Sequence, residues 1–145
     1  MPILPKPQWL QHLRELHATA AFGALGGEIL DVDDQTLQLR LPMTPATLTP
    51  FGNLHGGISA FLAETAASTH ACWGIDMAEK LPLGIELNAS HVSAAQEGHL
   101  LATARLISRT RKLAVHEVAI TLEETGQLLS KARVTNYYRN LTNRQ

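Results

Sequence analysis

The 145-residue chain has few of the residues that mark a specialised class of protein. Its single cysteine, Cys72, cannot form a disulfide within the chain, which fits a reducing compartment. The 12 basic and 13 acidic residues nearly balance, so general attraction to nucleic acid or anionic lipid is not expected. No stretch approaches the roughly 20 apolar residues of a membrane span, and the N-terminus lacks the pattern of a signal peptide. We therefore expect a cytoplasmic protein with one domain over residues 1–145 and with no nucleic-acid or membrane partner.

The sequence also lacks a recognisable metal site. Its histidines show no HExxH or comparable ligand spacing, and Cys72 has no CxxC partner. The seven histidines are His12, His17, His55, His70, His91, His99 and His116. We therefore expect no metal and no other cofactor, and a metalloenzyme is the weakest of the functional classes considered.

The first half of the chain predicts one short helix and two strands. Apolar residues recur at spacings of three and four over residues 8–20, which is typical of an amphipathic helix. They are Trp9, Leu10, Leu13, Leu16 and Ala20. Pro2, Pro5 and Pro7 are expected to keep the preceding residues out of regular structure. Strands are predicted over 28–33 and 36–41, because apolar and polar residues alternate in the second run.

Residues 58–73 predict a longer helix that is small and apolar almost all round. A helix of this kind is buried on most of its faces. Four β-rich runs follow at 83–94, 99–108, 113–122 and 128–138, divided by glycine-containing or charged turns. This order fits an α+β fold in which one long buried helix is wrapped by a curved antiparallel sheet.

Glu64 is a carboxylate in the middle of this apolar helix, where a charge is costly unless it is paired or protonated. His55, Gly56 and Gly57 stand just before the helix, whose free N–H groups favour developing negative charge. A thioester carbonyl under attack develops such a charge. Ser68 lies one turn after Glu64, on the same helical face. Each feature has a plain structural explanation alone, but their combination indicates a catalytic site.

The spacing within the helix also predicts an assembly. Gly56 and Glu64 are eight residues apart, which is about 12 Å along an α-helix. An oxyanion donor must lie within about 3 Å of the carbonyl oxygen, while the base must reach the same carbonyl carbon or its water. One helix cannot easily supply both groups, so two antiparallel copies are expected to share each active site.

Two motifs are similar to those of a known family. The stretches at residues 50–57 (PFGNLHGG) and 62–65 (LAET) resemble hotdog-fold acyl-CoA thioesterases that act on aryl-CoA esters, including the bacterial 1,4-dihydroxy-2-naphthoyl-CoA thioesterases. Further similarity covers residues 84–92, 97–98 and 109–117, and so nearly all of the chain after Phe22. The resemblance implies the hotdog fold and hydrolysis of acyl-CoA to free acid and coenzyme A.

The resemblance also implies roles for four residues. Glu64 would be the nucleophile or the general base, and the Gly56 N–H would polarise the thioester carbonyl. His55 would help to orient the site, and Ser68 would position the attacking water. The thioester would bind between subunits, in a dimer at minimum and commonly in a homotetramer built from two dimers.

Substrate-binding residues are predicted by the same resemblance. They are Thr49, Gly84, His91, Val92, Ser93, Arg109, Thr110 and Arg111. Thr49 replaces a glutamine common in the family, which leaves open how the thioester is held. Ser93 replaces an arginine, so a contact to the coenzyme A phosphates is missing or supplied elsewhere. The basic cluster that begins at Arg109 could supply it, although a solvated strand turn explains that cluster equally well.

Two other functions are compatible with the fold. A hotdog hydratase or dehydratase also combines a histidine with a carboxylate, although the glycine pair favours acyl transfer to water. A non-catalytic acyl-CoA binding module would keep the pocket without needing Glu64. The sequence does not identify the acyl group, which could be aryl, short or medium-chain.

Overall fold

The structure is a computed structural model that describes residues 3–141. Within these residues six strands form one antiparallel sheet in the order β1-β2-β4-β5-β6-β3. The strands are β1 (Glu28–Val32), β2 (Thr36–Pro42), β3 (Lys80–His91), β4 (His99–Arg109), β5 (Leu113–Leu122) and β6 (Leu128–Asn140). The helices are α1 (Lys6–Ala18), α2 (Ala21–Ala24) and α3 (Gly56–Ala71), with a 3-10 turn at Pro45–Thr47. The predicted α+β class, with one long helix against an antiparallel sheet, is confirmed.

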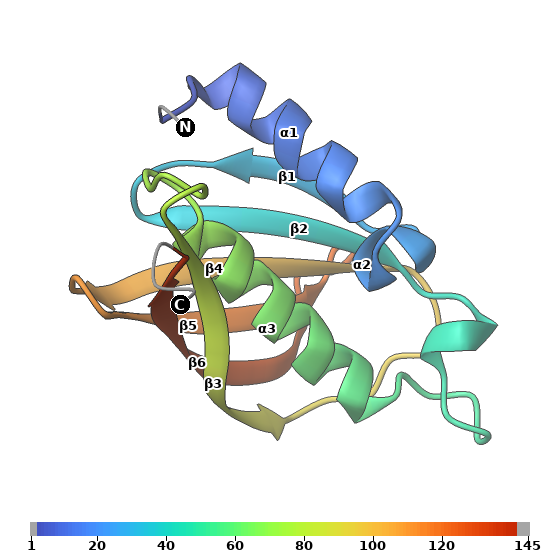
Figure 1. The fold of residues 1–145 in the computed structure, drawn as a ribbon. Coiled ribbons are helices and arrows are strands. Elements are labelled where there is room, and N and C mark those ends of the chain that lie inside the picture. The colour runs from blue at the N-terminus through green and yellow to red at the C-terminus, as the bar shows by residue number, and fades with distance from the viewer. Residues whose placement is uncertain (1–2, 142–145) are drawn as a thin grey trace.

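The helix α3 lies across one face of the sheet, which curves around it (Figure 1). Its buried side chains are mostly small, with Ala63, Ala66 and Ala67 fully buried, so its backbone can approach the strands closely. Alternate leucines of β2 face α3 and are also fully buried. The alternation that predicted this strand is therefore the alternation of core and surface.

The helix α1 packs along β1, at the edge of the sheet opposite β3 (Figure 1). Pro5 is its N-cap and Pro7 lies in its first turn, where the N–H that proline lacks has no helical partner to lose. The expectation that all three prolines precede the helix is therefore wrong for Pro7. Leu16, predicted on the apolar face, is 54% exposed because the buried stripe runs from Leu13 to His17 instead.

Two histidines form a buried pair between α3 and β5. The Nδ1 of His70 lies 2.7 Å from the Nε2 of His116, and the Nε2 of His70 lies 2.9 Å from the carbonyl oxygen of Asp33. Because that carbonyl only accepts, His70 is protonated on Nε2 and its bare Nδ1 accepts from the His116 Nε2–H. Both rings are fully buried. Burial lowers the pKa of His70, and burial together with the neighbouring His70 and Arg109 lowers the pKa of His116 to about 3.

This pair predicts acid-sensitive stability. In the unfolded chain a histidine takes up a proton near pH 6.5, whereas folded His116 resists protonation down to about pH 3. The stabilisation is therefore complete above pH 6.5 and is lost as the pH falls below it, by up to about 1.4 kcal/mol per pH unit for each histidine. Urea unfolding at fixed protein concentration measures this loss. Between pH 7.5 and 5 the free energy of unfolding of His116→Gln should fall by about 2 kcal/mol less than that of wild type.

The matched control is His12→Gln, which changes a half-buried histidine of α1 outside the pair. Its free energy of unfolding should fall with acid as steeply as that of wild type. If the free energy of unfolding falls equally steeply with acid in His116→Gln and in wild type, the buried pair does not cause the acid sensitivity.

No helix in the described part of the chain is long and apolar enough to cross a membrane.

Candidate active site

The N-terminus of α3 presents two hydrogen-bond donors. His55 is the N-cap, and its Nδ1 accepts from the Gly57 N–H at 2.8 Å. The bare Nδ1 leaves the proton of the neutral ring on Nε2, where it can be donated outward. Within residues 3–141 the Gly56 N–H has no acceptor, as expected at the first position of a helix. Capping the helix and donating outward are thus compatible in His55, because they use different ring nitrogens.

His91 lies directly beside this helix end. A Cβ atom on Gly56 would come within 2.7 Å of the His91 ring, so a side chain at this position would have to displace that ring. The Nδ1 of His91 is 3.0 Å from the Ser130 hydroxyl, which donates to the Ser90 carbonyl at 3.2 Å. His91 therefore donates from Nδ1 to Ser130, and its Nε2 is the ring nitrogen beside Gly56.

Glu64 stands at the centre of a second group of polar residues. Its side chain is exposed and packs over Gly84 of β3, where an added Cβ would collide with the carboxylate oxygen Oε1. One turn further along α3, the Ser68 hydroxyl donates to the Asn136 Oδ1 at 2.9 Å. Asn136 itself is fully buried and pairs with Gly84 in the sheet. The structure therefore brings Glu64, Ser68 and Gly84 together.

Asn136 and Ser130 are site residues that the sequence analysis missed. Both occupy inward positions of β6, whose buried residues alternate along the strand. Each contacts a predicted site residue, Asn136 through Ser68 and Ser130 through His91. Polar residues at inward positions of an alternating strand were the available signal, because a buried polar group needs a partner.

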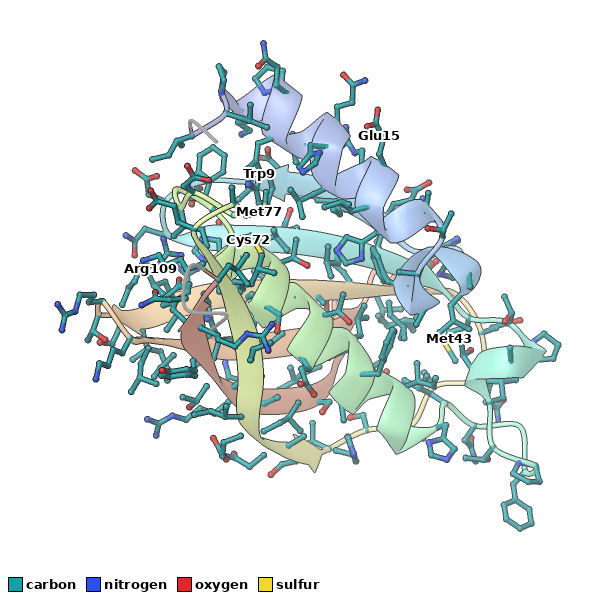
Figure 2. The ribbon with its side chains drawn as sticks, viewed as in Figure 1. Trp9, Glu15, Met43, Cys72, Met77 and Arg109 are labelled. Carbon is teal, nitrogen blue, oxygen red and sulfur yellow. The ribbon has the colours of Figure 1, made fainter. Side chains whose placement is uncertain are left out.

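A cavity of about 440 Å³ opens beside Glu64, between α1, α3 and β3. It is lined by Leu13, His17, Phe61, Glu64, Thr65, Ser68, Thr69, Cys72, Leu81, Pro82 and Leu83. Most of the wall is apolar, and its polar groups cluster on the α3 side, as in pockets for an apolar group with a polar head. Burial raises the pKa of the Cys72 thiol to about 12, so it is protonated and is no rival nucleophile. Cys72 lies at the C-terminal end of α3 (Figure 2).

Three other predicted binding residues organise the backbone near the N-terminus of α3. The Thr49 hydroxyl accepts from the Phe51 N–H at 3.3 Å, and so holds the turn that precedes the helix. Val92 and Ser93 follow β3, and their N–H groups donate to the Leu129 carbonyl. Val92 is 57% exposed, so its side chain is open to a ligand.

The predicted basic cluster lies at the other end of α3. Arg109 donates to the carbonyl oxygens of Trp73 and His70, at 2.8 and 3.1 Å, and so caps the C-terminus of this helix. Thr110 accepts from the N–H groups of Lys112 and Leu113 in the β4–β5 turn, and Arg111 is exposed there. Within one chain, these residues and Gly56 are at opposite ends of α3, whose 16 residues span about 24 Å.

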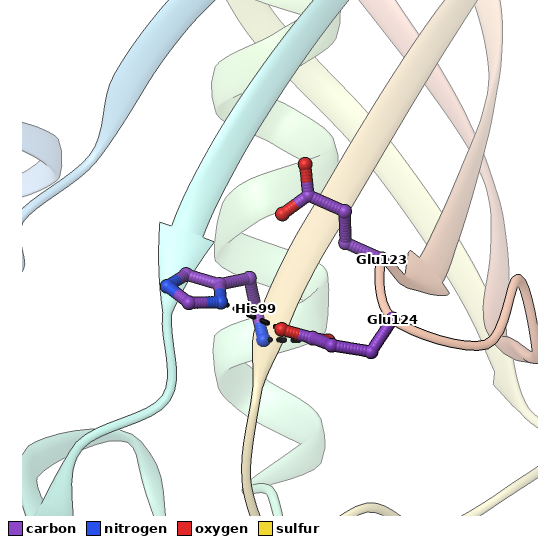
Figure 3. A group of neighbouring side chains, drawn as sticks. All are labelled: His99, Glu123 and Glu124. Atoms are coloured by element: carbon purple, nitrogen blue, oxygen red, sulfur yellow. Dashed lines mark hydrogen bonds and ion pairs between the residues drawn. The ribbon is translucent and has the colours of Figure 1, made fainter.

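One group of possible metal ligands is present in the described residues, where the sequence predicted none. His99, Glu123 and Glu124 place one ligand atom each within 4.8 Å of one another (Figure 3). Glu124 already pairs with His99 at 2.6 Å, and Glu123 pairs with Arg40 at 2.7 Å. Hydrogen bonds from His99 lower the pKa of Glu124 to about 2. These pairings explain the cluster as a surface ion-pair network.

The edge strand β3 contributes residues both to the N-terminus of α3 and to the surroundings of Glu64. It pairs with β6 on one side, and in the described part of the chain no strand pairs with its other side. Its Gly84 contacts Glu64, and its His91 contacts the start of α3. Leu83 and Ile85 on this strand are 39% and 60% exposed. A long edge strand leaves a row of backbone N–H and C=O groups without strand partners.

The chain belongs to the thioesterase superfamily, whose family model matches residues 51–129. It is a thioester hydrolase, and its architecture is the hotdog fold. A 1,4-dihydroxy-2-naphthoyl-CoA hydrolase from Listeria monocytogenes is 39% identical over 111 residues, covering 77% of this chain and 89% of that protein. The Escherichia coli protein of the same name is 34% identical over 104 residues, covering 72% of this chain and 75% of its own length.

Solved structures agree with these sequence similarities. The crystal structure of a thioesterase from Haemophilus influenzae superposes with a TM-score of 0.87 at 31% identity, covering 94% of each chain. A mutant thioesterase from Pseudomonas aeruginosa gives 0.86 at 30% identity, covering 91% of this chain and 94% of that one. The fold and reaction class implied by the sequence motifs are therefore confirmed.

Proposed function

We propose that the chain hydrolyses acyl-CoA thioesters with Glu64 as the catalytic carboxylate. The observation that carries this proposal is the position of Glu64 beside Ser68 at an apolar cavity. Two other features of α3 support it, namely the free N–H of Gly56 and the outward Nε2 of His55. Together they supply a base or nucleophile, a group that orients water, and donors for an oxyanion.

We further propose that each site is shared between two copies of the chain. A second copy of β3 pairing antiparallel with the first would cover the exposed Leu83 and Ile85 and would extend the sheet. The two α3 helices would then run antiparallel across a twofold axis, so that the start of one could approach the middle of the other. Gly56 and His55 of one subunit would then act with Glu64 and Ser68 of the other. A dimer is thus the smallest complete unit, and pairing of dimers into a tetramer is an expectation from the family resemblance.

Hydrolysis would proceed through attack on the thioester carbonyl carbon. With Glu64 as general base, it takes a proton from the water held by Ser68 while the water oxygen bonds to that carbon. The Gly56 N–H stabilises the resulting oxyanion, and the C–S bond then breaks. Coenzyme A thiolate leaves and takes up a proton, and the acid is released. With Glu64 as nucleophile, its oxygen bonds first and expels the thiolate, and water then hydrolyses the mixed anhydride.

The dihydroxynaphthoyl-CoA hydrolases among the relatives favour an aryl acyl group, and the apolar cavity also fits a medium aliphatic chain. Protein dialysed against EDTA should release free coenzyme A thiol from benzoyl-CoA and from medium-chain acyl-CoAs, because Glu64 and the N–H donors suffice for the reaction. Thiol release is followed with a disulfide dye. Loss of activity on chelation, restored by zinc, would contradict this mechanism.

The same preparation separates the two alternative functions. Hydration of crotonyl-CoA without thiol release would identify a hydratase. Binding of acyl-CoA without turnover of any member of the panel would identify a binding module.

A further inference from the structure

A second cavity, of about 590 Å³, lies next to the cavity that contains Glu64. It lies between the end of α1, α2 and β1 and is partly open to solvent, and it is lined by Arg14, His17, Ala18, Phe22, Gly23, Gly27, Glu28, Ile29 and Leu30. Within residues 3–141, His17 is the one residue that lines both cavities. The two spaces are therefore neighbours on either side of one side chain.

The His17 ring is held from both sides. Its Nε2 lies 3.3 Å from the Thr69 hydroxyl, which belongs to the wall of the Glu64 cavity. Its ring packs edge-on against Phe22, a wall residue of the second cavity, with the ring centres 5.3 Å apart. Burial lowers the pKa of His17, so the ring is neutral near pH 7. An uncharged ring fixed in this way can close the end of an apolar pocket.

The residues of α1 near His17 show which side of the helix faces the Glu64 cavity. Leu13, one turn earlier, is buried and lines the Glu64 cavity. Glu15, between them, points away from the body of the protein on the outer side of α1 (Figure 2). His17 thus continues the inward stripe of the helix, at the point where α1 ends and α2 turns the chain toward β1.

We propose that His17 forms the end wall of the acyl pocket and sets the greatest length of acyl group that the enzyme accepts. This inference rests on the proposed function, because it takes the Glu64 cavity as the acyl site. An acyl chain whose thioester lies at Glu64 would extend along Leu13 and Phe61 until it meets the ring. Removing the ring would join the two cavities, so that a longer chain could continue toward Phe22 and Ile29.

The test is a chain-length series on His17→Ala. Each methylene that enters an apolar pocket improves binding by about fourfold. In wild type this gain should stop at one chain length and then reverse, both in kcat/KM for straight-chain acyl-CoAs and in Kd for S-alkyl-CoA thioethers. In His17→Ala the gain should continue for two or more further methylenes, giving at least about a tenfold shift in preference toward long chains.

Two variants control for other effects of the substitution. His17→Phe keeps a ring between the cavities but loses the bond to Thr69, and it should keep the wild-type length limit. His12→Ala removes a histidine of the same helix that lines neither cavity, and its chain-length profile should match wild type.

The outcomes separate this inference from the proposed function. Hydrolysis by wild type with the same length limit in His17→Ala would refute the end-wall role and leave the thioesterase proposal standing. If no acyl-CoA is hydrolysed but His17→Ala binds longer S-alkyl-CoA thioethers than wild type does, the catalytic proposal is refuted. The role of His17 as end wall would then still stand. If His17→Ala does not fold, as judged by circular dichroism, His17→Ser replaces it, and an unchanged limit in that folded variant overturns the inference.

Discussion

Replacing Glu64 by glutamine is expected to lower kcat for acyl-CoA hydrolysis by about a thousandfold or more. Glutamine keeps the size and the position over Gly84, but it can neither take a proton from water nor form an anhydride. The side chain is exposed, so the protein should keep its fold. Affinity for S-alkyl-CoA should stay within a few-fold of wild type, because the cavity wall is preserved. The measurement is thiol release under saturating substrate, alongside circular dichroism.

A matched control makes the same chemical change elsewhere. Glu15→Gln alters an exposed carboxylate on the outer side of α1 (Figure 2). Its kcat should equal that of wild type. If folded Glu64→Gln has a kcat within tenfold of that of wild type, Glu64 is not the catalytic carboxylate. This conclusion does not depend on the result for Glu15→Gln.

The elements that sequence analysis predicted well are those specified locally. The helix α3 was predicted over 58–73 and spans Gly56–Ala71, because an uninterrupted run of small apolar residues follows a residue that can cap it. The His55 cap joins two residues that are two positions apart, so the tripeptide at residues 55–57 is enough to predict it. The alternation in β2 likewise records the burial of that strand. Local spacing was therefore sufficient for these elements and for placing Gly56 and Glu64 on one helix.

What the sequence could not supply depends on the register of distant strands. Asn136 reaches Ser68 because β6 pairs with β3 at Gly84, on an alignment that no local pattern fixes. Arg109 shows the same limitation in another way. Its basic neighbours left a phosphate contact and a solvated strand turn equally open. The structure adds a contact that neither interpretation included, because the guanidinium donates to the carbonyl of Trp73, 36 residues away, at the end of α3. Such contacts follow from tertiary packing and not from motif spacing.

The donor end of the site is expected to be the next most sensitive to substitution. Gly56→Pro removes the N–H that is proposed to hold the oxyanion, and kcat should fall by about 100- to 1,000-fold. Proline is tolerated at the first position of a helix, and His55 already has φ −70° and ψ 124°, a conformation that suits a residue before proline. Gly56→Ala is the matched control, because its Cβ crowds His91 in the same way but the N–H remains. Gly56→Ala should therefore lose much less activity than Gly56→Pro.

Mixing the two damaged proteins then tests whether the site is shared. If Glu64 of one subunit works with Gly56 of the other, a heterodimer of Glu64→Ala and Gly56→Pro holds one site with both defects and one with neither. Random pairing after joint refolding makes half of the dimers mixed, so about a quarter of wild-type activity should return. Refolding the variants separately before mixing should restore none until subunits exchange. If both variants fold, and heterodimers are detected by a tag on one of them, yet no activity returns, then each subunit carries a complete site. In that case β3 pairing would serve assembly alone, and the 12 Å between Gly56 and Glu64 would have to be bridged by the substrate within one chain.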